Sequence, residues 1–158
     1  MITFRTIDLK KDRTSIINFR KDSFIVSFGN LVGFHEGLYL TYVLEKIEQY
    51  PKGFVIAELD GKTIGQLELS VKEYHERQIG YVHLFYLVPE QRGLGNGNEL
   101  FTYAIEFFKK RSLEEYHLRV APENYRARRF YEKHGLKEIG PELDGKVIRM
   151  QGFITTSI

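Results

Sequence analysis

The segment 78-QIGYVHLFYLVPEQRGLGNGNEL-100 predicts a strand, a tight turn and a helix start in direct succession. Its first half, residues 82–88, is rich in β-branched and aromatic side chains, as buried strands are. Pro89 cannot donate a backbone hydrogen bond, so we expect regular strand pairing to end there. The pattern therefore predicts one long strand that stops at Pro89, and the other elements are placed relative to it.

The turn after this strand contains three glycines at alternate positions, Gly93, Gly95 and Gly97. Glycine lacks a Cβ atom, so a ligand can approach the backbone closely here. The residues that follow, 98–110, have the spacing of a helix with one buried apolar face. A glycine-rich turn at a helix N-terminus leaves N–H groups free beside the positive end of the helix dipole, which suits a phosphate or pyrophosphate.

Two familiar phosphate motifs do not fit this turn. A Walker loop needs Lys-Ser or Lys-Thr after the glycines, and neither is present. A Rossmann fingerprint needs a third glycine, where this chain has Asn98 or Leu100. The pattern that fits is Arg-x-x-Gly-x-Gly at Arg92, Gly95 and Gly97, which resembles the acyl-coenzyme A loop of the GNAT superfamily of acyl-CoA-dependent N-acyltransferases. A plain turn between strand and helix is the alternative.

A second stretch, LRVAPENYRARRFYEKHGL at 118–136, has the spacing N-x-x-A-x-x-x-Y-x-x-x-G-[F/L]. It resembles the second characteristic part of GNAT enzymes, in which a helix lies beside the coenzyme. On a helix Asn124, Ala127 and Tyr131 share one face, because they are three and four residues apart. The alternative is that Asn124 caps the helix and that Tyr131 packs in the core.

The whole chain predicts the element order β-α-α-β-β-β-α-β-α-β-β in a single domain, residues 1–158. A meander of strands, followed by strands separated by helices, indicates a mixed α/β sheet. This order is also that of the GNAT fold. The clearest hairpin signal is Asp60-Gly61 between strand-like runs at 54–59 and 63–71. The other expected elements are strands at 3–7, 116–120, 137–139 and 147–153, and helices at 38–49 and 124–134.

Three segments give weaker expectations. Asp12 is expected to cap a helix that runs to about Arg20. Residues 23–37 combine three glycines with aromatic side chains, so we expect a mobile, partly apolar segment there. Residues 73–77 are expected to form a charged connection.

Composition excludes several classes of function. The net charge is +2, from 23 Lys and Arg against 21 Asp and Glu, which gives no argument for nucleic-acid or membrane binding. No cysteine is present, so disulfides, zinc–cysteine sites and an acyl-cysteine intermediate are excluded. No apolar run approaches the ~20 residues of a membrane span. The first twelve residues lack the apolar core of a signal peptide, so we expect a cytoplasmic protein. The histidine spacing predicts no metal site.

The resemblance implies direct attack of an amine on an acyl thioester, with acetyl-CoA as co-substrate. Divergence of the strand 82–88 from the strand 116–120 would make a slot for the pantetheine arm. The strand end would contact the coenzyme through its backbone, the loop would hold the pyrophosphate with Arg92 near the phosphates, and the later helix would lie alongside. The implied coenzyme residues are Phe85, Leu87, Arg92, Gly93, Leu94, Gly95, Asn96, Gly97, Asn98, Asn124, Ala127 and Tyr131.

Tyr131 is the candidate acid for the leaving thiolate, because an ordinary tyrosine, with a pKa of about 10, keeps its proton at neutral pH. The rival interpretation gives it only a positioning hydrogen bond to the sulfur. Tyr81 and His83 share one strand face and are candidates for the base side of the reaction. Tyr81 stands where some family members carry a catalytic Glu, so this chain departs from the family pattern and has no carboxylate at that position. The other possibilities are Glu36, Glu68 and a water chain.

The leading hypothesis is an N-acetyltransferase that acts on a primary amine. A non-catalytic acyl-CoA-binding regulatory domain on the same fold is the alternative. The acceptor should contact residues 24–42 and the face of Tyr81 and His83, a region that indicates neither a polyamine nor a peptide terminus. A homodimer, common in the family, is compatible with the sequence.

Overall fold

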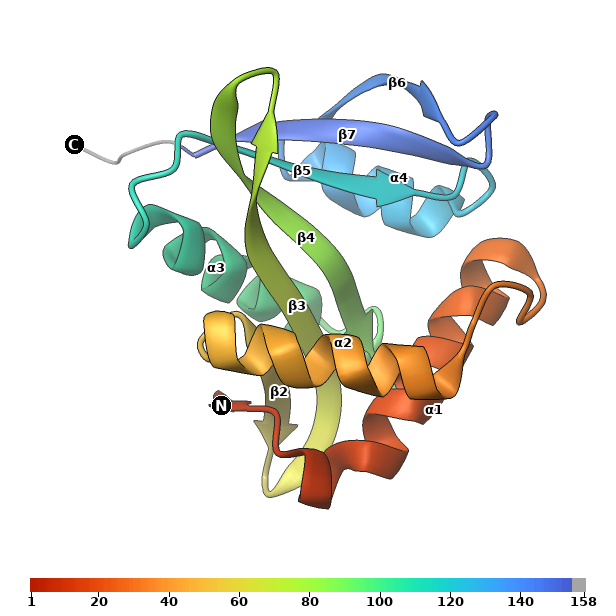
Figure 1. The fold of residues 1–158 in the computed structure, drawn as a ribbon, viewed down its shortest axis with the longest axis vertical. Coiled ribbons are helices and arrows are strands. Elements are labelled where there is room, and N and C mark those ends of the chain that lie inside the picture. The colour runs from red at the N-terminus through yellow and green to blue at the C-terminus, as the bar shows by residue number, and fades with distance from the viewer. Residues whose placement is uncertain (155–158) are drawn as a thin grey trace.

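The computed structural model describes residues 1–154, and a seven-stranded mixed sheet is its centre (Figure 1). The strand order is β1-β2-β3-β4-β5-β7-β6. Neighbouring strands are antiparallel except β4 and β5, which run parallel. The strands are β1 Ile2–Thr6, β2 Phe54–Leu59, β3 Lys62–Tyr74, β4 Arg77–Leu87, β5 Glu115–Val120, β6 Lys137–Glu142 and β7 Val147–Phe153. This element order and the mixed α/β class are those expected from the sequence.

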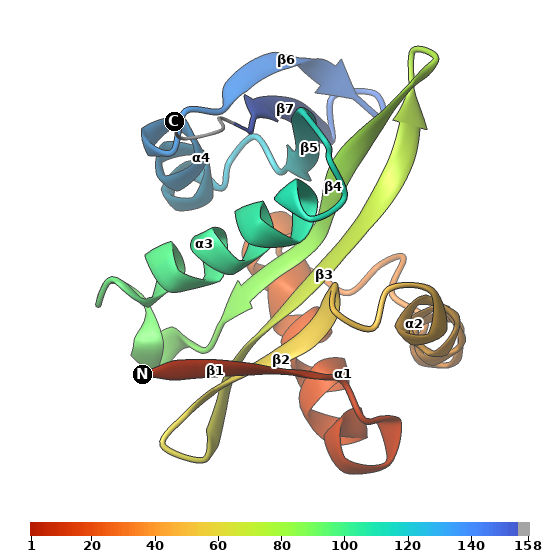
Figure 2. The ribbon, with the colours of Figure 1, turned by 90° about the vertical axis from the view of Figure 1, so that its left-hand side faces the viewer.

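Four α-helices in the described residues cover the two faces of the sheet (Figure 2). They are α1 Leu9–Phe28, α2 Glu36–Gln49, α3 Asn96–Lys109 and α4 Tyr125–Lys133, with the short 3-10 helix η1 Pro89–Gln91 after β4. Ile16 of α1 and Val43 of α2 pack with Phe54 and Ile56 on one face. The residues of α3 and α4 belong to the larger core cluster on the opposite face.

The middle of the sheet opens where β4 and β5 diverge. Their parallel pairing extends only from Gly80↔Tyr116 to Val82↔Leu118, although β4 continues to Leu87. On the other side of β4, the pairing with β3 shifts register at His83, between Leu69↔Val82 and Glu68↔Leu84. Such a bulge bends its strand and re-aims side chains. The expected divergence of the two strands is confirmed, and the bulge adds a feature that the sequence did not predict.

The first helix differs from its predicted bounds. It begins at Leu9, with Asp8 as the N-cap whose side chain accepts from the Lys10 N–H. Asp12 is not the cap: it is 2% exposed, accepts from the Asp8 N–H, and pairs with Arg5 at 2.7 Å. The prediction failed because Asp8 and Asp12 both suit a first helical turn, and only the tertiary contact with Arg5 distinguishes them.

Two segments expected to be irregular are regular in part, and residues 29–35 of the first are irregular as expected. Helix α1 continues through Phe28 and ends at Gly29, which has the left-handed φ of 75° that helix C-termini favour. Strands β3 and β4 extend to Tyr74 and from Arg77, so the expected connection shrinks to a hairpin turn at His75 and Glu76. Both turn residues have positive φ, 48° and 65°, as a type I′ turn requires. No glycine stands at this turn, so the sequence did not indicate it.

None of the described helices is long and apolar enough to cross a membrane.

Candidate active site

Two cavities adjoin in the structure. The first, which we call the loop cavity, has a volume of about 490 Å³ and lies between the glycine loop, the end of β4 and α4. The second, the aromatic cavity, has a volume of about 710 Å³ and lies between α1, α2 and the strands β3–β5. Ser23 and Ser27 of α1 line both. The adjoining cavities can therefore hold two different molecules in contact with one another.

The glycine loop presents unused N–H groups to the loop cavity. Gly93 and Gly95 have left-handed φ values of 76° and 87°. A Cβ atom at Gly97 would lie 3.0 Å from the Phe130 ring. Within residues 1–154, the N–H groups of residues 93–97 donate no hydrogen bond. These donors stand at the N-terminus of α3, so the loop is suited to an anion such as a pyrophosphate.

Cations on α4 complete this anion site, and sequence reasoning missed them. Arg126, Arg129 and Lys133 line the loop cavity. The Arg126 Nη2 lies 3.2 Å from where a Cβ of Gly93 would stand, so this guanidinium is beside the loop. The spacing of the three by three and four residues was available in the sequence and would have put them on one helical face.

Arg92 lines the loop cavity, but its guanidinium is engaged with the protein. Its Nε donates to the Leu87 carbonyl at 2.8 Å and its Nη2 donates to Asp22 at 3.0 Å. The guanidinium also lies 5.3 Å from the centroid of the Tyr86 ring. Arg92 thus ties the loop to β4 and α1 while it lines the cavity, and its place near the phosphates stays a prediction.

The other expected coenzyme residues lie around the same cavity, with two differences. Lining residues include Phe85, Leu87, Gly93, Gly95, Gly97, Asn98, Asn124, Ala127 and Tyr131. The side chains of Leu94, which is 68% exposed, and Asn96, which donates to Gln91, are not in this lining. Only their backbone groups are available to a ligand there. Asn124 also caps α4, because its Oδ1 accepts from the Ala127 N–H at 3.3 Å.

Tyr131 places a protonated hydroxyl in the cavity wall. Its ring packs against Phe85 and Phe130, with centroid distances of 6.1 and 5.6 Å. The hydroxyl forms no hydrogen bond with another residue in the described range 1–154. Burial raises the pKa of Tyr131 above its ordinary value, so the phenol stays protonated at neutral pH and is a donor.

The aromatic cavity contains Tyr81 and His83, whose rings lie 4.8 Å apart between centroids. The His83 Nε2 is 2.6 Å from the Ser70 Oγ. Burial, followed by the charges of Lys72, Lys46 and Arg20, lowers the pKa of His83 to about 3. His83 is therefore neutral but weakly basic at pH 7, which its ordinary pKa of about 6.5 did not predict.

The two carboxylates considered as bases differ in position. Glu36, in the first turn of α2, does not line the aromatic cavity. Glu68 is fully buried beneath it, accepts from the Tyr39 hydroxyl at 2.5 Å and from Gln66 at 3.0 Å, and leaves its Oε1 without a partner. Burial raises the pKa of Glu68. Neither carboxylate is an exposed base in the cavity.

The splayed sheet and the phosphate-suited loop at the point of divergence are the features expected of the class of acyl-CoA-dependent acyltransferases. The chain belongs to the acetyltransferase (GNAT) family, since the profile of that family matches residues 14–136. The resemblance found in the sequence is thereby confirmed.

Relatives agree with this family, and a solved structure shares its fold. An uncharacterised N-acetyltransferase of Archaeoglobus fulgidus is 33% identical over 96 residues, which cover 59% of this chain and 64% of the relative. One of Methanocaldococcus jannaschii is 30% identical over 103 residues, 63% of this chain and 44% of the relative. The PaiA N-acetyltransferase of Thermoplasma acidophilum, solved in complex with coenzyme A, superposes with a TM-score of 0.73 at 22% identity. This superposition covers 97% of our chain and 99% of PaiA, and it supports the fold.

Proposed function

We propose that this protein transfers an acetyl group from acetyl-CoA to a primary amine by direct attack. The observation that carries the proposal is the meeting of the two cavities at Ser23 and Ser27. One cavity has the free N–H groups and cations that a pyrophosphate needs, and the other has room for an acceptor. The coenzyme A part of acetyl-CoA fits the loop cavity in chemical terms, and acetyl-CoA, when bound, would supply the activated thioester.

Tyr131 is the proposed donor to the leaving thiolate. Its raised pKa keeps the proton in place, and its hydroxyl has no competing partner within residues 1–154. Phe85 and Leu87 lie beyond the last β4–β5 pair, so their backbone groups are available to the acyl and pantetheine parts. Asn124, Ala127, Asn98 and residues 93–97 form the rest of the proposed coenzyme site.

His83 and Tyr81 are proposed to contact the acceptor amine. With a pKa of about 3, His83 can accept a hydrogen bond from the amine but is a weak base. Burial raises the pKa of Tyr81, so its hydroxyl is also neutral. We propose that the amine enters with its proton already lost to solvent, and that these groups orient it.

The test is release of coenzyme A from acetyl-CoA over a panel of primary amines, with the acetylated product identified by mass spectrometry. Amine-dependent release is expected, and Tyr131→Phe should diminish it. Tight acetyl-CoA binding without acetylation of any amine would instead favour a regulatory acyl-CoA-binding domain.

A further inference from the structure

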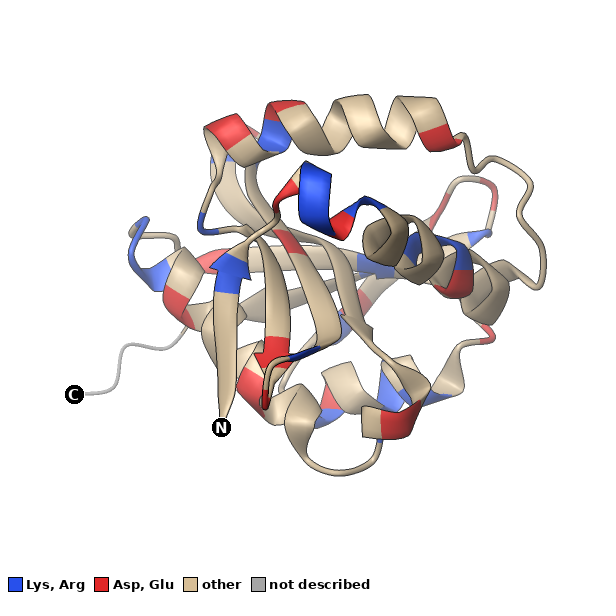
Figure 3. Cartoon of the chain, turned by 90° about the horizontal axis from the view of Figure 1, so that it is seen from below, with Lys and Arg blue, Asp and Glu red and all other residues tan. Residues whose placement is uncertain are grey.

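We propose that the aromatic cavity selects amines that also carry an anionic group, either a carboxylate or a phosphate. The inference rests on the proposed function and specifies the class of acceptor for that same site. It comes from the charges around the cavity, which the net charge of the whole chain does not reveal. Figure 3 shows basic and acidic residues interspersed along the ribbon, so the charge of this cavity is a local property.

The cavity wall is cationic. Among the described residues, four side chains with positive charge line it and no Asp or Glu does. The four are Arg20, Lys46, Lys72 and Arg119. Within residues 1–154, the first three form no ion pair within 4 Å. A ligand in the cavity therefore meets positive charges that the protein leaves uncompensated.

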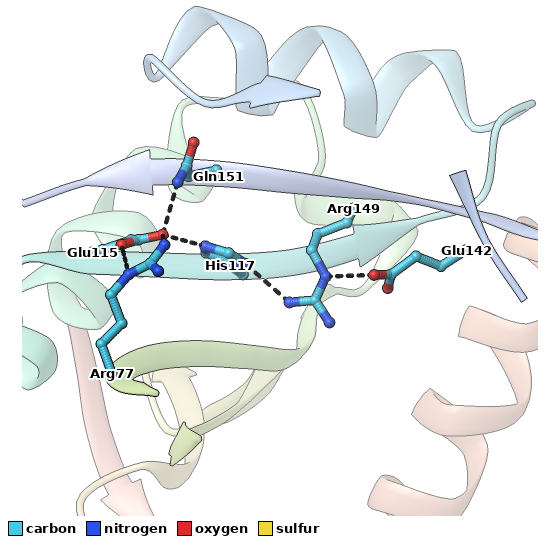
Figure 4. A network of polar contacts seen from close by, with 6 residues as sticks. All are labelled: Arg77, Glu115, His117, Glu142, Arg149 and Gln151. Atoms are coloured by element: carbon cyan, nitrogen blue, oxygen red, sulfur yellow. Dashed lines mark hydrogen bonds and ion pairs between the residues drawn. The ribbon is translucent and has the colours of Figure 1, made fainter. Parts of the chain in front are cut away.

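The carboxylates nearby do not cancel these charges. Glu142 is shared, because Arg119 donates to it at 2.8 Å and Arg149 at 2.9 Å. Glu115 is held by Arg77, Gln151 and His117, as Figure 4 shows. Glu68 lies close enough to Arg20 for their charges to interact.

Even with both Glu68 and Glu142 ionised, five cations face two carboxylates. The cations are those four and Arg149, which lies 5.8 Å from the centroid of the Tyr81 ring. The other titratable groups in the lining are His35, His83, Tyr39, Tyr42 and Tyr81, none of which supplies negative charge at neutral pH. A net positive potential remains.

The lowered pKa values of two groups in the cavity lining, Lys72 and His83, agree with this positive potential. The Lys72 ammonium lies 4.3 Å from the centroid of the Tyr81 ring, which holds it at the cavity wall. Burial, then the charges of Arg119, Arg149 and Lys46, lowers the pKa of Lys72. Cations likewise add to burial in lowering the pKa of His83. The same potential would disfavour a polyamine, whose additional ammonium groups would be repelled, and would attract an anionic acceptor.

The experiment compares matched acceptors. An amino acid is assayed against its carboxamide, and phosphoethanolamine against ethanolamine, with spermidine as the polycation. Each anionic member should have the higher kcat/KM, calculated on the concentration of its unprotonated amine, by about tenfold, the scale of one charge-assisted hydrogen bond. The pair with the larger ratio identifies carboxylate or phosphate as the preferred group.

Variants of the cationic residues then test whether the lining of the aromatic cavity causes the preference for anionic amines. Lys72→Gln should raise KM for the anionic amine about fivefold, near the upper end for an exposed ion pair, and leave KM for its neutral partner unchanged. Adding Arg119→Gln should multiply the effect if the two sites are independent. Lys110→Gln is the matched control, because Lys110 lines a separate cavity with Phe4 and residues of α3.

Two kinds of failure are distinguishable. If no amine is acetylated, the proposed function fails. If amines are acetylated but neutral or polycationic ones have equal or higher kcat/KM, or if Lys72→Gln affects both members of a pair equally, this inference alone is overturned.

Discussion

The Tyr131 hydroxyl combines a fixed position with a retained proton, and both properties come from burial of its ring. Tyr131→Phe keeps the ring and deletes the hydroxyl, so we expect a folded protein with acetyl-CoA affinity within a few-fold of the parent. The loss in kcat should be roughly 10- to 1,000-fold, as for removal of one proton donor to a leaving group. A more acidic leaving thiol should shrink this loss. Steady-state kinetics with acetyl-CoA and with an acyl donor that has a more acidic leaving thiol measure this loss. Weakened acetyl-CoA binding with intact kcat would make Tyr131 a binding residue.

His83 gives a second prediction at the scale of one residue. Because its pKa is lowered to about 3, His83 is already deprotonated throughout pH 5–9. An acidic limb of kcat/KM in that range should therefore follow protonation of the acceptor amine. His83→Ala should lower the rate but keep the limb at the same pH. The pH–rate profiles of parent and variant test this. A limb near pH 6.5 that disappears in His83→Ala would restore His83 as the general base.

The loop and α3 form the element on which coenzyme binding depends. At Gly95 the left-handed φ of 87° makes a valine unfavourable by about 1–2 kcal/mol. A valine at Gly97 would press on Phe130 and turn the loop donors away. We expect either valine variant to fold but to lose coenzyme A affinity by calorimetry. Gly37→Ala is the control, since nothing lies within 4 Å of its Cβ position. Normal affinity in a folded Gly97→Val would leave these glycines only a role in the turn.

The contact between β4, β5 and β7 gives an element-scale prediction about stability. Hydrogen bonds from Arg77, then from Gln151 and His117, lower the pKa of Glu115 to about 2. A depressed carboxyl pKa stabilises the fold above the unfolded value of about 4.3 and loses that effect as pH falls toward the folded value. Glu115→Gln should therefore be less stable than the parent at pH 7, with the difference shrinking between about pH 4.3 and 2.

Urea unfolding at several pH values measures this difference. The control is Glu99→Gln, a change of the same type at an exposed position of α3. A difference that does not depend on pH would mean that Glu115 acts through packing and hydrogen bonding alone.

For the whole molecule, ligand binding should stabilise the native state. A ligand at 100 times its Kd adds about 2.7 kcal/mol. A chain of this size gains about 2–4 °C in Tm per kcal/mol, so acetyl-CoA should raise Tm by about 5–10 °C. NAD and ATP should shift Tm much less, since they lack the pantetheine arm. Thermal scans with the three ligands test this, and equal shifts would contradict the assignment of the loop cavity to a coenzyme.

Local properties of the chain were sufficient for much of the fold. The strand that ends at Pro89, the alternate glycines and the helix after them depend on φ preferences and on side-chain spacing. The hairpin at Asp60-Gly61 and the helix capped by Asn124 were predictable for the same reason. These features require only neighbours within a few residues, so the sequence was enough to determine them and, with them, the family.

Only the tertiary structure decided the charge around the site and the place where its two cavities meet. Ser23 and Ser27 join the two cavities because α1 continues past the predicted end at Arg20. The low pKa of His83 comes from burial and from cations on other elements. The local pattern of 24–42 gave no sign of a charged acceptor, because the cations beside it come mainly from β3, β5 and the far end of α2. Burial and charge–charge distance depend on residues far apart in sequence, and only folding sets them.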